Sequence, residues 1–393
     1  MMLYNKRISA RTYTIFSTIL LVLQFGISLE IFATFIFFSF LTLIVFYYTR
    51  PDARKTLLKV CRYSAASIVL ALVVLSPFIY YLLVGLHNLP NKIHPLSPFS
   101  TNLANLLIPT PTSLVAGNLL KTLSNHFTAN ISENGAYIGL PLLLTLLYIF
   151  IKQWGNKLIR GLIIVLIIIG IASLGPKLHI ISQIGTTIPM PWYLFSKLPL
   201  LKSAQPDRFS IYFFLLIAVV LALWLTENNL NKTQVRIRYF IVLVGVLFLI
   251  PNPSLYQYSK PEVPAIFQKK NVSKYIPKQD NVLILPFNNL GSGIYYQYAS
   301  GMAFTQSGGY VGFIPKNYTN SPVIIGFQTG VLSSNFRHQF YDYLVSNQVK
   351  EVIYNPNTTF QSVVNIIKSY HCRLRIGLLA ILFRRKIFGI AMM

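Results

Sequence analysis

The sequence predicts a mainly α-helical, polytopic membrane bundle followed by a small extracytoplasmic α/β domain, and three observations support this fold class. Hydrophobic residues make up 54% of the 393-residue chain and charged residues only 11%, whereas about a quarter are charged in soluble domains. Long, nearly uncharged runs recur, each close to the roughly 20 residues that a membrane-spanning helix needs. After residue 251 these runs give way to shorter strand-like and helix-like patterns. We therefore expect a transmembrane region at 1–251 and an α/β domain at 252–393.

Seven apolar segments are expected to be the membrane spans. They are Tyr13–Leu29, Ile31–Tyr48, Tyr63–Val84, Ala136–Ile151, Leu158–Leu174, Phe209–Thr226 and Tyr239–Ile250. Only Glu30 separates the first two, so these form either two spans, one bent helix or a re-entrant hairpin. The seventh segment is short for a span.

Basic residues indicate how these spans are oriented. They cluster before the first span and in alternate short connectors, at 50–62, 152–160 and 232–238. Lys and Arg collect on the cytoplasmic side of membrane proteins, which places the N-terminus and these connectors in the cytoplasm. The long loops at 87–135 and 175–208 and the domain at 252–393 are then extracytoplasmic. We expect a multi-pass protein of a cell membrane, with the bilayer as its first partner.

The overall charge fits this interpretation. The chain has 34 Lys and Arg against 9 Asp and Glu, a formal net charge of +25. Membrane-facing connectors explain this excess better than nucleic-acid binding does. The histidines and the two cysteines lack metal-ligand spacing, and no Gly-rich phosphate loop, DxD or Ser/His/Asp pattern stands out. We expect no metal, no cofactor and no nucleic-acid partner.

The stretch "IPMPWYLFSKLPLLKSAQPDRF" at Ile188–Phe209 concentrates proline and positive charge between two apolar runs. Its prolines exclude a long helix and favour extended or turned backbone at the outer face. Trp192 and Tyr193 are expected to lie at the depth of the lipid headgroups.

Arg208 lies immediately before the span that begins near Phe209. A cation at this end of a helix opposes the helix dipole, so an anion should compensate it. Asp207 is one candidate. A lipid phosphate or pyrophosphate is the other, since the guanidinium fork suits phosphate and Lys197 and Lys202 lie in the same connector.

Two glutamates are candidate site residues. Glu30 is the only carboxylate within an apolar stretch, which marks it as functional by default. The alternative is that it caps the second helix at the outer interface. Glu133, in "NISENGAYIGL", either caps the next membrane helix or belongs to the site.

The region after residue 251 is expected to form a compact α/β unit. Val282–Pro286 and Glu351–Tyr354 should be parallel neighbours. Short apolar strands of this kind are covered on both faces, so burial is expected for Leu283, Leu285, Val352 and Tyr354. "GLLAILF" is either a final strand or the start of a tail on the membrane surface.

The stretch "LFSKLPLLKSAQPDRFSIYFFLLIAVVLAL" resembles a segment of bacterial membrane proteins related to the type C (GT-C) glycosyltransferases. In these a proline-rich outer connector ends in an Arg-x-Pro-x-Arg-Phe pattern and enters a membrane helix. Pro206, Arg208 and Phe209 match this pattern, and Ala204 stands where the first arginine usually is. Further similar stretches are "LQFGISLEIF", with Gln24 and Glu30; "SENGAYIGLPLLL", with Glu133, Tyr137 and Gly139; "SLGP" at Ser173–Pro176; and the outer-domain stretch "VLILPF…YYQYASGMAFTQSGGY".

The resemblance implies a glycosyltransferase-like protein of the cell envelope that moves a sugar from a polyprenyl-phosphate donor at the outer face. Arg208, with Lys197 and Lys202, would hold the lipid phosphate, and Glu30 or Glu133 would lie near the acceptor. Members of the family carry a catalytic aspartate in their first outer loop, and nothing between Met1 and Gln24 matches it. The chain is therefore expected to correspond to the C-terminal half of such a protein, with a separate N-terminal half as a partner.

Two other functions compete with this one. The chain could be a non-catalytic membrane scaffold or accessory subunit. It could also be a transporter, in which Glu30 would be a coupling or substrate-binding residue. Catalytic residues, and whether the chain is an enzyme at all, stay open at this stage.

Overall fold

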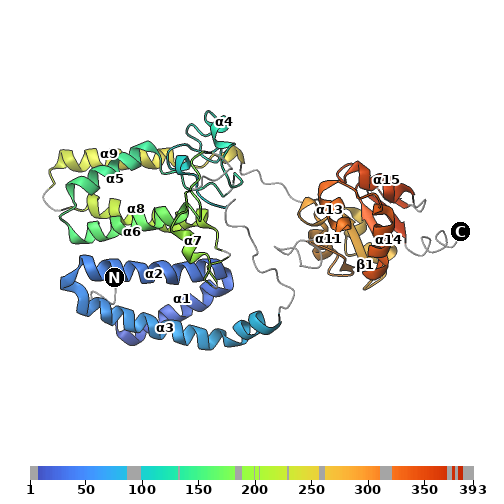
Figure 1. Ribbon diagram of the computed structural model, residues 1–393, viewed down its shortest axis with the longest axis horizontal. Helices are drawn as coiled ribbons and strands as arrows, with labels where there is room; N and C mark the ends of the chain where they lie inside the picture. The colour runs from blue at the N-terminus through green and yellow to red at the C-terminus, as the bar shows by residue number, and fades with distance from the viewer. Residues whose placement is uncertain are drawn as a thin grey trace. The chain divides into compact units, whose positions relative to one another are not determined.

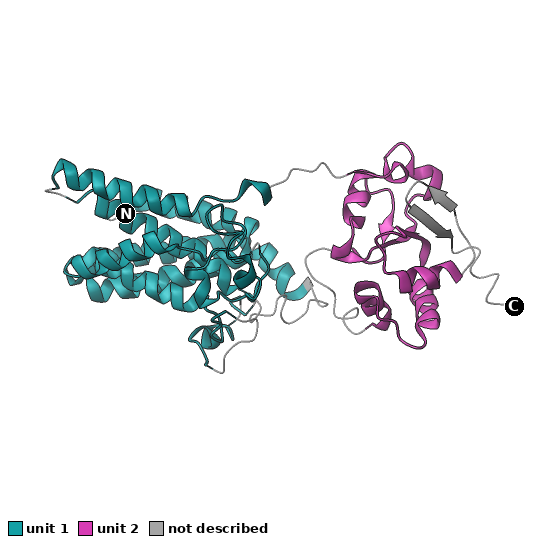
Figure 2. Ribbon diagram, turned by 90° about the horizontal axis from the view of Figure 1, so that it is seen from above, with its two compact units in different colours: residues 1–86, 92–257 teal, residues 87–91, 258–393 magenta. Residues whose placement is uncertain are grey.

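The computed structural model divides the chain into two compact units, Met1–Leu86 with Lys92–Gln257, and His87–Asn91 with Tyr258–Met393 (Figure 2). The structure describes residues 8–85, 99–131, 133–181, 188–198, 200–202, 204–227, 230–255, 262–309, 321–369, 374–376 and 379–383.

Three helices open the first unit: α1 (Ala10–Ile27), α2 (Leu29–Thr49) and α3 (Arg54–Tyr80), which continues as a π-helical turn over Tyr81–Gly85. Ser28 separates α1 from α2, because its extended backbone (φ −158°, ψ 111°) interrupts the helix and its hydroxyl accepts a hydrogen bond from the Ile31 N–H. The expected break between the first two segments therefore yields two distinct helices and not one bent helix. Leu21, Phe32 and Ala71 form a small core where the three helices meet.

Four further helices form the rest of the bundle: α5 (Leu140–Lys152), α6 (Lys157–Ser173), α8 (Ser210–Leu225) and α9 (Lys232–Phe248). Asn156 caps α6, and Asn231 with Gln234 forms a capping box at the start of α9. In their described residues the connectors hold short helices, α4 (Lys121–Ser124) and α7 (Trp192–Phe195), and 3₁₀ turns at Pro51–Ala53, Leu103–Leu106 and Pro206–Phe209. The prolines of Ile188–Phe209 thus limit helix length as expected.

Trp192 corrects one expectation. It is fully buried, packed against Phe37, Phe38 and Phe209 in the core that α2, α5, α6 and α8 share. The aromatic side chain of α7 therefore anchors the connector to the bundle and does not lie among lipid headgroups. Tyr193, the next residue, is exposed.

Each of the seven predicted apolar segments contains a helix. Four are long and apolar enough to cross a membrane, at Ala10–Ile27, Leu29–Thr49, Pro51–Val84 and Pro206–Leu225, and Leu140–Lys152 is a shorter apolar helix. These are the features of an α-helical membrane protein.

The basic connectors lie at one end of this bundle. Figure 1 shows that the turns joining α2 to α3, α5 to α6 and α8 to α9 lie at the same end. The Lys157 ammonium lies 4.0 Å from the Asp52 carboxylate, which joins two of these turns directly. The starts of α2, α5 and α8 lie at the opposite end.

Orientation across the membrane gives a first prediction. Gly155 lies in the basic turn between α5 and α6 and has open space around it, and Ser292 is exposed in the second unit. In a chain whose Cys61 and Cys372 are replaced by serine, an impermeant thiol reagent on intact cells should modify Ser292→Cys and spare Gly155→Cys, because positive connectors stay in the cytoplasm. Labelling of Gly155→Cys alone would contradict this prediction and would indicate the opposite orientation in the membrane. Lysed cells, in which both cysteines should react, are the control.

Close packing of α5 on α9 gives a second prediction. A Cβ atom added at Gly245 of α9 would overlap Leu142 Cδ2 and would lie 2.6 Å from Leu142 Cγ. Gly245→Val should therefore destabilise the unit by about 1–2 kcal/mol through overpacking, measured by unfolding of the purified protein in detergent. Gly170→Val on α6, where an added Cβ would meet no packing neighbour within 4 Å, is the matched control. Equal effects of the two variants would contradict this packing.

The second unit contains a five-stranded sheet with strand order β2-β1-β3-β5-β4. The strands are β1 (Asn281–Leu285), β2 (Thr305–Gln306), β3 (Val349–Tyr354), β4 (Leu374–Ile376) and β5 (Leu379–Phe383). β1 is parallel to β2 and β3, whereas β5 is antiparallel to β3 and β4. The helices are α10 (Val272–Tyr275), α11 (Gly293–Ala299), α13 (Pro322–Thr329), α14 (Phe336–Ser346) and α15 (Gln361–Ser369).

The predicted strand pairing is confirmed. Val282 pairs with Glu351 and Leu285 with Tyr354 in the parallel register. The four residues expected to be buried, Leu283, Leu285, Val352 and Tyr354, are at most 1% exposed. Alternate residues of β1 and β3 contribute to two different hydrophobic clusters, so both faces of the central strands are covered. "GLLAILF" contains strand β5, as the first of its two interpretations predicted.

Candidate functional site

The candidate site is built from three segments that are distant in sequence. Glu30 lies in the first turn of α2, which begins directly after the capping residue Ser28. Glu133 lies in the loop before α5, where its N–H donates to the Asn130 backbone and side-chain oxygens. Arg208 lies in the 3₁₀ turn Pro206–Phe209, which leads into α8. All three segments lie near helix starts at the end of the bundle opposite the basic turns.

Arg208 forms ion pairs with both glutamates. Its Nε and Nη2 donate to Glu133 Oε2 and Oε1 at 3.2 and 2.9 Å, a bidentate fork. Its Nη1 donates to Glu30 Oε2 at 2.9 Å. The other oxygen of Glu30 accepts a hydrogen bond from the Gln205 N–H at 2.7 Å, so the glutamate also holds the connector that carries Arg208. We call Glu30, Glu133 and Arg208 the Arg208 triad.

The structure corrects the expected partner of Arg208. Asp207 is 2% exposed, and neither of its carboxylate oxygens accepts a hydrogen bond from the described residues. Its backbone N–H donates to the Phe99 carbonyl instead. The cation at the start of α8 is therefore compensated by negative charge. This charge belongs to two glutamates that are distant in sequence from Arg208, and not to the adjacent aspartate.

The capping interpretations of Glu30 and Glu133 were wrong. Ser28 provides the side-chain cap of α2, and the N-cap of α5 is Gly139, six residues after Glu133. Both carboxylates accept hydrogen bonds from Arg208 instead. The interpretation of Glu30 and Glu133 as members of one polar site fits this geometry.

The lysines of the connector are placed differently. The Lys197 ammonium lies 4.4 Å from the centre of the Tyr193 ring, a cation–π contact. Lys202 is exposed. Within the described parts of the chain, neither lysine forms an ion pair with Glu30 or Glu133. The structure thus unites Arg208 with the glutamates, and the two lysines stay on the surface of the same connector.

A second polar contact beside the triad was missed by the sequence analysis. The Tyr212 hydroxyl lies 2.7 Å from Thr34 Oγ1 and donates to the Ile31 carbonyl at 3.2 Å. Tyr212 follows Arg208 by four residues and Thr34 follows Glu30 by four residues, so each pair shares one helix face. This spacing is the sequence signal that could have found the contact. It fixes α2 against α8 one helical turn below the triad.

The triad is accessible enough to meet a ligand. The side chain of Arg208 is 40% exposed, and those of Glu30 and Glu133 are 17% and 22% exposed. A guanidinium has five N–H donors, and the three bonds within the triad leave two of them without a partner in the described residues. The site therefore offers carboxylate acceptors for hydroxyl groups and two donors for an oxygen anion.

In the described part of the chain, no cluster of three or more His, Cys, Asp or Glu side chains is placed to hold a metal ion. The apolar helices, the partly exposed triad at their ends and the separate α/β unit define a class: α-helical membrane proteins that carry an α/β domain. No protein-family model, no curated protein and no solved structure matches this chain.

Proposed function

We propose that this protein binds a polyprenyl-phosphate sugar at the outer face of a bacterial cell membrane, as a relative of the GT-C glycosyltransferases. The Arg208 triad would be its polar binding site. The observation that supports the proposal is the convergence of Glu30, Glu133 and Arg208 from three segments at one end of the bundle, with all three side chains partly exposed. In this proposal the bundle crosses the membrane seven times and presents the triad to the outer leaflet.

The charge of the triad suggests which part of the ligand lies where. Two carboxylates and one guanidinium give a formal charge of −1, which favours a neutral, hydroxyl-rich group over a second anion beside the glutamates. Sugar hydroxyls would donate to Glu30 and Glu133. The lipid phosphate would lie on the exposed side of Arg208 and accept the two remaining N–H groups. Lys197 and Lys202 lie in the same connector and would add positive charge at the surface.

If transfer takes place here, the glutamates are the candidate general bases. A general base must be ionised when the acceptor hydroxyl arrives. The Arg208 guanidinium donates to both carboxylates, and the bidentate fork fixes the orientation of Glu133. The base would accept the proton of an acceptor hydroxyl as the acceptor oxygen bonds to the anomeric carbon of the sugar, and the bond from that carbon to the phosphate oxygen would break to release polyprenyl phosphate.

A second candidate function is a non-catalytic membrane scaffold, and one observation favours it. The triad uses three of five guanidinium donors to join α2, the loop before α5 and the start of α8. Such a contact holds three segments together whether or not a ligand binds. The two functions differ in what a conservative change of Arg208 does to ligand binding.

Arg208→Lys tests the proposal. Lysine keeps the charge but loses the planar fork, so binding of a polyprenyl-phosphate sugar to the purified protein should weaken about tenfold, as expected for one charge-assisted hydrogen bond. The matched control is Arg236→Lys, an exposed arginine of α9 at the other end of the bundle. A stable, folded wild-type protein that binds no such lipid would favour the scaffold.

A further inference from the structure

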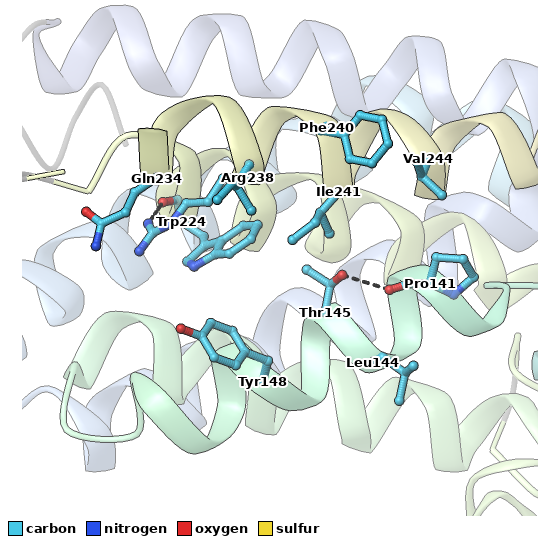
Figure 3. A pocket seen from close by; sticks show the side chains of 11 residues that line it. Pro141, Leu144, Thr145, Tyr148, Trp224, Gln234, Arg238, Phe240, Ile241 and Val244 are labelled. Atoms are coloured by element: carbon cyan, nitrogen blue, oxygen red, sulfur yellow. Dashed lines mark hydrogen bonds between the residues drawn. The ribbon is translucent and has the colours of Figure 1, made fainter. Parts of the chain in front are cut away.

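An open groove with a volume of about 500 Å³ lies between α5 and α9, beside Trp224 of α8. This is within the roughly 300–1,000 Å³ of small-molecule sites. Figure 3 shows Trp224, Gln234, Arg238 and Tyr148 at one end of it and Pro141, Leu144 and Val244 toward the other. The groove thus has a polar mouth and an apolar body.

The polar mouth lies at the basic end of the bundle. Arg238 Nη1 donates to the Trp224 carbonyl and pairs with Glu227, and the guanidinium lies 4.7 Å above the Trp224 ring. Its Nε and Nη2 make no hydrogen bond to the described residues. Lys232 and Arg236 lie on the same first turns of α9. Arg238 thus keeps donors that the described residues do not use, and Lys232 and Arg236 add positive charge to this end of α9 without lining the groove.

The whole groove, from its polar mouth to its apolar end, has about the length of one leaflet. The lining residues of α9 run from Gln234 to Val244, ten residues that rise about 15 Å at 1.5 Å each. This is half of the roughly 30 Å hydrocarbon core of a bilayer. Between these ends the groove is lined by Leu144, Ile237, Phe240 and Ile241. An acyl chain that begins at the mouth would end near the middle of the membrane.

We propose that this groove binds an anionic phospholipid from the leaflet on the basic side of the membrane. Its phosphate would accept hydrogen bonds from Arg238 Nε and Nη2 and from the exposed Gln234 amide, and one acyl chain would lie between α5 and α9. Basic pockets between membrane helices on the cytoplasmic side are suited to anionic headgroups. The indole of Trp224 and the phenol of Tyr148 suit the interface between headgroup and hydrocarbon. The site is distinct from the Arg208 triad, which lies at the other end of the helices.

The charge of the ligand is tested by titrating the purified full chain with phosphatidylglycerol or phosphatidylcholine and counting bound lipids by native mass spectrometry. Phosphatidylglycerol should bind about tenfold more tightly. Arg238→Gln should remove this preference and Arg238→Lys should keep part of it. Arg236→Gln removes the same charge from an exposed position outside the groove and should leave the preference nearly intact. Equal losses in Arg236→Gln and Arg238→Gln would overturn the proposal, because diffuse charge alone would then explain binding.

The position of the acyl chain is tested by filling the groove. Val244→Trp places a ring in the groove, whereas Val246→Trp places the same ring on an exposed face of α9. Only the first should release the tightly bound phosphatidylglycerol. Retention of the lipid in Val244→Trp would overturn the proposal. So would a change in the number of protein copies per particle without loss of lipid, since the groove would then hold a helix of a second copy.

Discussion

Arg208→Ala is expected to lower the free energy of unfolding of the helical unit by about 2–3 kcal/mol. Removing one member of a fully buried ion pair costs about 3–5 kcal/mol, and exposed pairs contribute about 0–1 kcal/mol. Arg208 lies between these limits, because its side chain is 40% exposed while its two partners are largely buried. Alanine leaves Glu30 and Glu133 side by side without their common cation. Unfolding in detergent, followed by far-UV circular dichroism, measures the loss.

A neutral version of the triad separates charge from shape. Arg208→Met combined with Glu30→Gln and Glu133→Gln removes all three charges and keeps similar volumes. Neutral replacements of buried ion pairs are often tolerated, so this triple variant should recover most of the stability lost in Arg208→Ala. If the triple variant were as unstable as Arg208→Ala, the arginine would not stabilise the unit by compensating the negative charge of the two glutamates.

Phe340→Ala is expected to destabilise the α/β unit by about 3–5 kcal/mol, the cost of truncating a buried phenylalanine. Phe340 of α14 is fully buried, and its ring packs against Phe327 and Phe336. Susceptibility of the second unit to limited proteolysis should rise accordingly. Tyr298→Ala, at a residue that is 69% exposed, is the control and should change little. Comparable effects of both variants would contradict this core.

Much of the fold follows from the sequence for identifiable reasons. Long uncharged runs can bury their backbone polar groups only as helices in a membrane, and each predicted segment contains one. Strands β1 and β3 were predictable because short runs of Val, Ile and Leu bounded by polar residues are typical of strands covered on both faces. Trp192 was misplaced because an aromatic in a membrane connector fits the interface and the core equally well in sequence, and only packing against Phe38 and Phe209 decides between them.

The members of the site were predictable, and their pairing was not. Glu30 and Arg208 stood out because charge is rare in apolar runs. Their contact joins residues 178 positions apart, and the contact of Arg208 with Glu133 joins residues 75 positions apart. Such contacts depend on how α2, α5 and α8 assemble, which one sequence does not reveal. Proximity in sequence favoured Asp207 instead, although its buried carboxylate accepts no hydrogen bond from the Arg208 guanidinium.

The proposed binding of a sugar-bearing polyprenyl phosphate by the Arg208 triad is tested most directly with the triple variant. The purified wild-type chain and the folded Arg208→Met, Glu30→Gln, Glu133→Gln variant are titrated with the same polyprenyl-phosphate sugar. The proposed function predicts that the variant loses at least about tenfold in affinity. The carboxylates that accept from the sugar hydroxyls and the guanidinium that donates to the phosphate lose their charge together. Equal affinity of the two folded proteins would contradict it and leave the triad as a structural contact between three segments.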